Sequence, residues 1–70
     1  MNDKNRAIEH FKKSVKQNPE NPSPANNLAV VYMSLGKFEQ ANKILEEQLK
    51  KHPDNKALKY NYEQVLKNLE

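Results

Sequence analysis

The amino-acid sequence repeats itself with a period of about 34 residues, the separation that relates Ala7 to Ala41. The matching positions include prolines that break helices and small or apolar residues of the kind that fill a core. Agreement at both kinds of position is typical of a supersecondary unit that buries its apolar face only against its neighbours. The matched pairs are Ala7–Ala41, Phe11–Leu45, Val15–Leu49, Lys16–Lys50, Pro19–Pro53, Asn21–Asn55, Asn27–Asn61 and Val31–Val65. We therefore expect a row of similar structural units.

Apolar residues recur at helical spacing in four segments, and no segment alternates as a strand does. The segments run over about residues 3–17, from Ser23-Pro24 to Gly36, over about residues 38–51, and beyond Pro53-Asp54-Asn55. The stripes expected to face inward are Ala7, Ile8, Phe11 and Val15; Leu28, Val31, Tyr32 and Leu35; Phe38, Ala41, Ile44, Leu45 and Leu49; and Leu58, Tyr62, Val65, Leu66 and Leu69. Because the connections are short, consecutive helices should pack antiparallel.

Three residues predict where the second helix begins and ends. Ser23 is a good N-cap, and Pro24 suits the first helical position because proline has no N–H to leave unsatisfied. Gly36 readily takes the left-handed conformation found just past a helix terminus. The second helix is therefore predicted to lie between these signals.

Residues 22–55 resemble one complete repeat of the tetratricopeptide family, whose period is also about 34 residues. The residues that match the family's pattern in order and spacing are Leu28, Ala29, Tyr32, Gly36, Phe38, Ala41, Leu45 and Pro53. Ala25 departs from the pattern where the family has a large aromatic residue, and Gln48 where it has a small one. The resemblance implies an all-α fold of antiparallel helical hairpins in a short right-handed superhelical stack of four helices.

The resemblance covers the whole chain as a single domain, residues 1–70, with an unusual phase. Residues 1–21 resemble the second helix of a partial repeat, and residues 56–70 resemble the first helix of another partial repeat or a capping helix. Glu63 stands where the family keeps a small residue for the partner helix, which favours the capping role, whereas Ala7 keeps the small residue. The order is therefore half hairpin, full hairpin, half hairpin.

The composition of the chain and the spacing of its polar residues argue against several classes of function. The chain has no cysteine, a net charge of +3 and no apolar run of membrane-spanning length, so we expect a cytoplasmic protein. His10 and His52 lie far apart and have no companions at ligand spacing, so we expect neither a metal site nor a catalytic site. No phosphate-binding glycine loop is present, and no cofactor is expected. The chain is not expected to be an enzyme.

The family resemblance implies a protein-interaction module that binds a peptide or a partner helix in a concave groove. Carried onto this sequence, the groove candidates are Asn26, Asn27, Val30, Met33, Tyr60, Asn61, Gln64 and Lys67. The basic clamp for a terminal carboxylate found in chaperone-binding members is not reproduced, because Ala57 and Asn61 stand where its later basic pair would be. The alternative is that these are ordinary exposed helix positions of a spacer.

Two other functions remain open at this point. The first is self-association through the exposed face of the first helix. Here a weak two-fold dimer is expected rather than a head-to-tail stack, because Glu63 would meet Ala7 in the stack. The second is nucleic-acid binding, which we consider the less favoured because the aromatics other than Tyr60 lie mostly on the inward stripes. The lysines that would serve it are Lys12, Lys13, Lys16, Lys50, Lys51 and Lys59.

Overall fold

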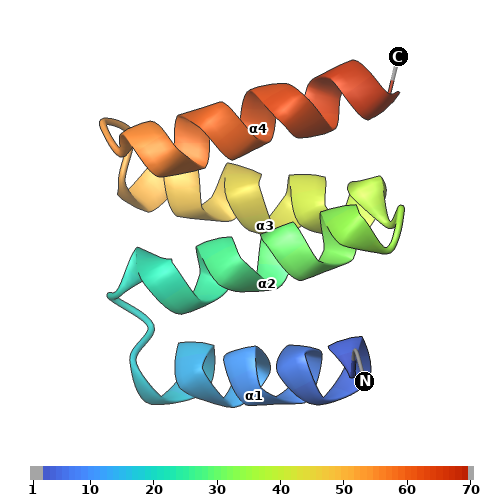
Figure 1. Cartoon of the computed structure of the whole chain (residues 1–70). Helices are drawn as coiled ribbons and strands as arrows, with labels where there is room; N and C mark the ends of the chain where they lie inside the picture. The colour runs from blue at the N-terminus through green and yellow to red at the C-terminus, as the bar shows by residue number, and fades with distance from the viewer. Residues whose placement is uncertain (1–2, 70) are drawn as a thin grey trace.

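The computed structural model describes residues 3–69, which form four α-helices in one row (Figure 1). The helices are α1 (Lys4–Gln17), α2 (Pro22–Ser34), α3 (Phe38–Lys51) and α4 (Lys56–Leu69). Consecutive helices run antiparallel, with α1 at one end of the row and α4 at the other. Within the described residues there is no strand. The all-α fold of stacked helical hairpins is thus confirmed.

The turn after α1 and the turn after α3 lie one repeat period apart and have the same construction. The backbone N–H of Asn21 donates to the carbonyl of Asn18 at 3.1 Å, and the N–H of Asn55 donates to the carbonyl of His52 at 3.2 Å. In each turn the asparagine side chain then caps the helix that follows. The sequence repeat therefore extends to the hydrogen bonds of the turns.

The start of α2 differs from the prediction by two residues. Asn21 is the N-cap in place of Ser23, and Pro22 takes the first helical position that was assigned to Pro24. The side-chain oxygen of Asn21 accepts a hydrogen bond of 3.0 Å from the backbone N–H of Ser23. Both Asn-Pro and Ser-Pro are suitable starts, and Pro24 fits within the first turn because N–H groups there have no partner inside the helix.

The turn at Gly36 closes α2, as predicted. Gly36 has a φ of 76°, in the left-handed region that glycine adopts without a steric penalty. Its N–H donates to the carbonyl of Met33 at 3.0 Å, and the N–H of Lys37 donates to the carbonyl of Tyr32 at 2.8 Å. This pair of bonds is a Schellman motif, which satisfies carbonyl groups at the end of the helix and turns the chain toward α3.

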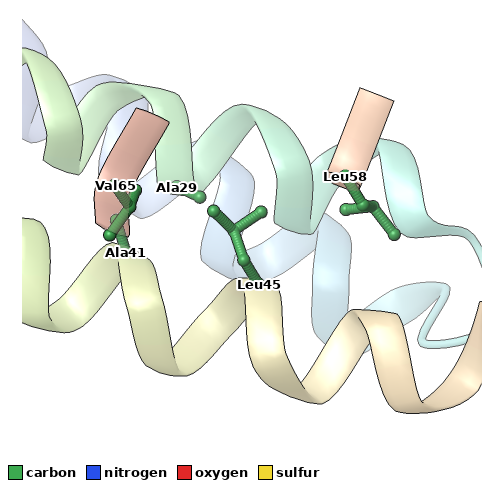
Figure 2. Close-up of a cluster of buried hydrophobic side chains, with 5 residues drawn as sticks. All are labelled: Ala29, Ala41, Leu45, Leu58 and Val65. Atoms are coloured by element: carbon green, nitrogen blue, oxygen red, sulfur yellow. The ribbon is translucent and has the colours of Figure 1, made fainter. Parts of the chain in front are cut away.

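The core is a cluster of five fully buried side chains contributed by α2, α3 and α4 (Figure 2). They are Ala29 of α2, Ala41 and Leu45 of α3, and Leu58 and Val65 of α4. Ala29 and Ala41 let α2 and α3 approach closely, as their small size predicts. In Figure 2, Val65 of α4 lies by the two alanines and Leu58 of α4 lies on the other side of Leu45, so one cluster joins three helices.

Helix α1 contributes nothing to this cluster. Among the described helices it contacts α2 alone, and none of its residues is fully buried. Its Ala7 and Phe11 are half-buried, whereas the repeat-equivalent residues Ala41 and Leu45 are 0% exposed. At these two positions the first helix therefore buries less of its apolar stripe than the third helix does.

Three leucines that were predicted to face inward are substantially exposed. Leu35, Leu66 and Leu69 are 39%, 40% and 42% exposed, respectively. Leu35 is the last residue before the Gly36 turn, and the other two lie on a side of α4 that its neighbours cover only in part. Helical spacing identified the apolar side of α4 correctly, but burial also requires a neighbour on that side.

The two departures from the family pattern are both buried. Ala25 is 2% exposed and Gln48 is 5% exposed, although glutamine is rarely buried. Relative to the family pattern, the side chain of Ala25 on α2 is smaller and the side chain of Gln48 on α3 is larger. Both substitutions therefore change the core, which the sequence pattern did not show.

Candidate peptide-binding groove

The eight groove candidates come from α2 and α4, two helices that contact each other although α3 separates them in the sequence. The side-chain amide of Asn61 on α4 donates to the side-chain oxygen of Asn26 on α2, over 2.8 Å. This partly buried hydrogen bond joins the two helices at the level of the candidate surface. The repeat had paired Asn61 with Asn27, so the identity of its hydrogen-bond partner was not predicted.

Exposure divides the candidates into two groups of four. The exposed members are Asn27, Val30, Tyr60 and Lys67, and the half-buried members are Asn26, Met33, Asn61 and Gln64. Met33 packs against the core cluster, so its thioether has less freedom to contact a ligand than the sequence implied. The surface that a partner meets first therefore consists of one aromatic, one aliphatic, one amide and one ammonium group.

Tyr60 is the most exposed large apolar side chain among the described residues, at 62%. Val30 of α2 follows at 43%. Tyr60 directly precedes Asn61 in α4, whose amide is bonded to α2, so the aromatic ring stands on a segment whose position is fixed. An aromatic residue held in this way offers a large contact area with few rotamers to restrict on binding.

Two hollows of the surface lie along the seam between α3 and α4. One, of about 260 Å³, is lined by Glu46, Leu49, Lys50 and Tyr62. Another, of about 330 Å³, is lined by Leu69 of α4 and by residues 36–40 at the start of α3. Neither of these two hollows is lined by a groove candidate.

The phenol of Tyr62 lines the first hollow. Burial raises the pKa of its phenol, and the negative charge of Glu46 raises it further. The phenol also donates a hydrogen bond of 3.4 Å to the Glu46 carboxylate, which stabilises the protonated form. Sequence patterns did not predict this pair, because its members lie 16 residues apart on different helices.

The lysines considered for nucleic-acid binding lie outside the groove candidates. Lys12 and Lys13 are exposed on α1, which does not contact α4 within the described structure. Of the phenylalanine and tyrosine side chains in the described residues only Tyr60 is exposed, and the others are half-buried. Stacking of bases needs exposed aromatic rings beside the cations, and on α1 only the imidazole of His10 is exposed.

The described residues contain no group of three or more His, Asp or Glu side chains that could hold a metal ion. None of the described helices is long and apolar enough to cross a membrane.

Comparison with curated proteins and with solved structures found no match. A family model described as tetratricopeptide repeat matches residues 2–66, which span the complete repeat and most of both partial ones. The match agrees with the stacked hairpins, with the paired alanines in the core and with the turns that recur after one repeat period. The chain belongs to the tetratricopeptide repeat family.

Proposed function

We propose that the chain binds a peptide or a partner helix on the surface formed by α2 and α4. Tetratricopeptide repeats generally mediate protein–protein interactions and are not themselves enzymes. The observation that carries the proposal is the position of Tyr60. It is widely exposed beside the hydrogen bond that joins the two helices of the surface.

The chemistry of the surface favours a partly apolar partner. Tyr60 and Val30 supply apolar contact, Asn27 supplies donors and acceptors for a peptide backbone, and Lys67 supplies one positive charge. One ammonium group is a weak attraction for a strongly acidic tail, which would need a cluster of cations. An extended or helical segment with one or two apolar anchors therefore fits best.

The expected affinity is low because the surface spans only two helices. Its contact area falls below that of a standard-size interface, so a dissociation constant of ~10 µM or weaker is expected for a single peptide. Tyr60 is the best single anchor, since tyrosine and other aromatic residues dominate the energetics of small interfaces.

The test begins with a library of short synthetic peptides, amphipathic and acidic, screened by fluorescence polarisation against the 70-residue chain. Tyr60→Ala should weaken the best binder about tenfold, or ~1.4 kcal/mol, with an unchanged circular dichroism spectrum. Tyr60→Phe keeps the ring and should retain most of the affinity. Acidic peptides should bind less well than amphipathic ones.

The matched control removes charge outside the surface. Lys12→Ala and Lys13→Ala on α1 should leave peptide affinity unchanged, because α1 contributes no groove candidate. If these two variants weakened binding and Tyr60→Ala did not, the surface on α2 and α4 would be rejected. A basic surface that binds acidic ligands or nucleic acid would then take its place.

A second function, weak dimerisation through α1, is favoured by the half-buried apolar stripe of that helix. Such a two-fold contact would close at the dimer, since each copy uses the same surface. Light scattering over a concentration series tests it. A strict monomer at the highest concentration would remove this function and leave the peptide surface unaffected.

A further inference from the structure

The two halves of the central α2–α3 hairpin recur at the two ends of the molecule. Helix α4 begins one repeat period after α2, and α1 precedes α3 by the same period and has the same length as α3. Position by position, α4 is therefore a second copy of α2, and α1 is a second copy of α3. In the described structure α4 contacts only α2 and α3, and α1 contacts only α2. Among the described residues, then, neither end helix has the hairpin partner that its central counterpart has.

The face of α4 that corresponds to the α3-binding face of α2 is apolar and partly open. Leu28 of α2 is 6% exposed, but its counterpart Tyr62 on α4 is only half-buried and borders the 260 Å³ hollow. Tyr32 of α2 packs against the core, whereas its counterpart Leu66 is 40% exposed. Leu69, one turn further, borders the second hollow. Tyr62 packs against the core cluster and donates to Glu46 of α3, so this face of α4 is covered in part, and its Leu66 side is left exposed.

The complementary face is present on α1. Ala41 and Leu45, which α3 buries completely, correspond to Ala7 and Phe11 of α1. Both are half-buried, and the small residue needed for close helix crossing is retained at Ala7. Helix α1 of a second copy therefore carries the pattern that the open face of α4 is shaped to receive.

One residue opposes this fit. Glu63 occupies the position of Ala29, which is 0% exposed at the crossing of α2 with α3. In a stacked pair the Glu63 side chain would have to enter the crossing opposite Ala7, where it would be too large and its charge would lose water. A buried charge without a partner is strongly unfavourable. Lys4 lies one turn from Ala7, but its ammonium group donates to the carbonyl of Ser34 within its own chain.

We propose that the open face of α4 is a docking surface for α1 of a second copy of this chain, and that Glu63 is the residue that keeps the docking weak. Removing the carboxylate converts the chain into a head-to-tail stack. The contact uses two different surfaces, so it continues from copy to copy and does not close at two. This distinguishes it from pairing of α1 with α1, which involves no residue of α4.

Sedimentation velocity of the 70-residue chain over a concentration series tests the proposal. Glu63→Ala should associate at least tenfold more tightly than the native chain and give a series of dimers, trimers and larger species. Glu63→Gln removes the charge and keeps the size, and should fall between the two. Glu47→Ala, at an exposed position of α3 on neither surface, is the matched control and should behave as the native chain.

A mixing experiment identifies the two surfaces. The double variant Ala7→Glu with Glu63→Ala has an open α4 face and a blocked α1 face, so it should not stack on itself. The native chain has an open α1 face, and its α4 face is blocked by Glu63. Mixed together, the two should form a complex of one copy each, which grows no further. Circular dichroism of every variant confirms that the helices are intact.

The proposal is overturned if Glu63→Ala stays as weakly associated as the native chain, or if it associates only to a closed dimer. It is also overturned if Ala7→Glu fails to suppress the stacking of Glu63→Ala. In that case the Glu63 face would bind something other than α1. The proposal is likewise overturned if the mixed complex does not form although both chains are folded.

Discussion

Helices α1 and α3 occupy the same place in the repeat, have 14 residues each and begin their apolar stripes in the same register, yet their burial differs completely. Helix α3 lies between α2 and α4 and buries three of its residues, whereas α1 contacts α2 alone and buries none. Equivalent residues thus reach different environments. What a repeat residue contributes to stability depends on the helices beside it more than on its own type.

The largest effect expected from this comparison concerns the pair Leu45 and Phe11. Leu45→Ala should lower the free energy of unfolding by about 2–4 kcal/mol, because it leaves a cavity in a side-chain cluster that is 0% exposed. Phe11→Ala should cost only about 1–2 kcal/mol, although it removes a larger side chain, since that ring is half-buried. Urea denaturation followed by circular dichroism measures both. Equal losses would show that α1 is packed as tightly as α3.

A smaller difference is expected at the two alanines of the crossing position. Ala41→Leu should destabilise the chain by about 1–3 kcal/mol, because the added atoms have no space against Ala29. Ala7→Leu should change stability by less than about 0.5 kcal/mol, since Ala7 is only half-buried and α1 has a single neighbouring helix. The thermal midpoints of the two variants provide the measurement. A neutral Ala41→Leu would mean that α2 and α3 do not cross at this point.

The smallest effect concerns the hydrogen-bonded pair of Tyr62 on α4 and Glu46 on α3. This pair has no equivalent between α2 and α1. The corresponding positions hold Leu28 and Lys12. Because the folded chain raises the pKa of Tyr62 above its ordinary value of 10.0, the unfolded chain loses this phenol proton first as the pH rises. Its contribution to stability is therefore complete below pH 10.0 and declines as the pH climbs from there toward the raised pKa.

Absorbance titration of the phenolate tests this pair. The difference between the native chain and Tyr62→Phe isolates the Tyr62 transition from those of the other tyrosines. Glu46→Gln should bring the pKa of Tyr62 down toward its ordinary value, because it removes a nearby negative charge. An unchanged transition in Glu46→Gln would show that burial alone raises this pKa.

The sequence predicted the fold well where a local signal decides the outcome. The bounds of α3, Phe38–Lys51, agree with the predicted range, and the Gly36 turn closes α2 as expected. The predicted start of α2 was wrong because Asn21-Pro22 and Ser23-Pro24 carry the same cap-and-proline signal two residues apart. A local pattern cannot rank two such starts, and the turn that precedes them favours the first.

The candidate surface was less predictable, because its geometry comes from the way two helices are set side by side. The repeat pairs Asn27 with Asn61, but the hydrogen bond joins Asn61 to Asn26, since the relative stagger and rotation of α2 and α4 decide which amide is in reach. The inward placement of Leu66 was wrong for a related reason. Helical spacing predicts which side of a helix is apolar. Whether a neighbouring helix covers that side depends on how the helices pack.

The isolation of α1 from the buried cluster has a consequence for the motions of the chain. All helix–helix contacts of α1 are with α2, and the five residues of the cluster belong to α2, α3 and α4. The first helix can therefore detach while the cluster stays intact, in a local opening that requires less free energy than global unfolding. Backbone amides of α1 should then exchange their hydrogens with solvent through this opening, and those around Leu45 only when the whole chain unfolds. The row of helices should thus show two protection levels along its length.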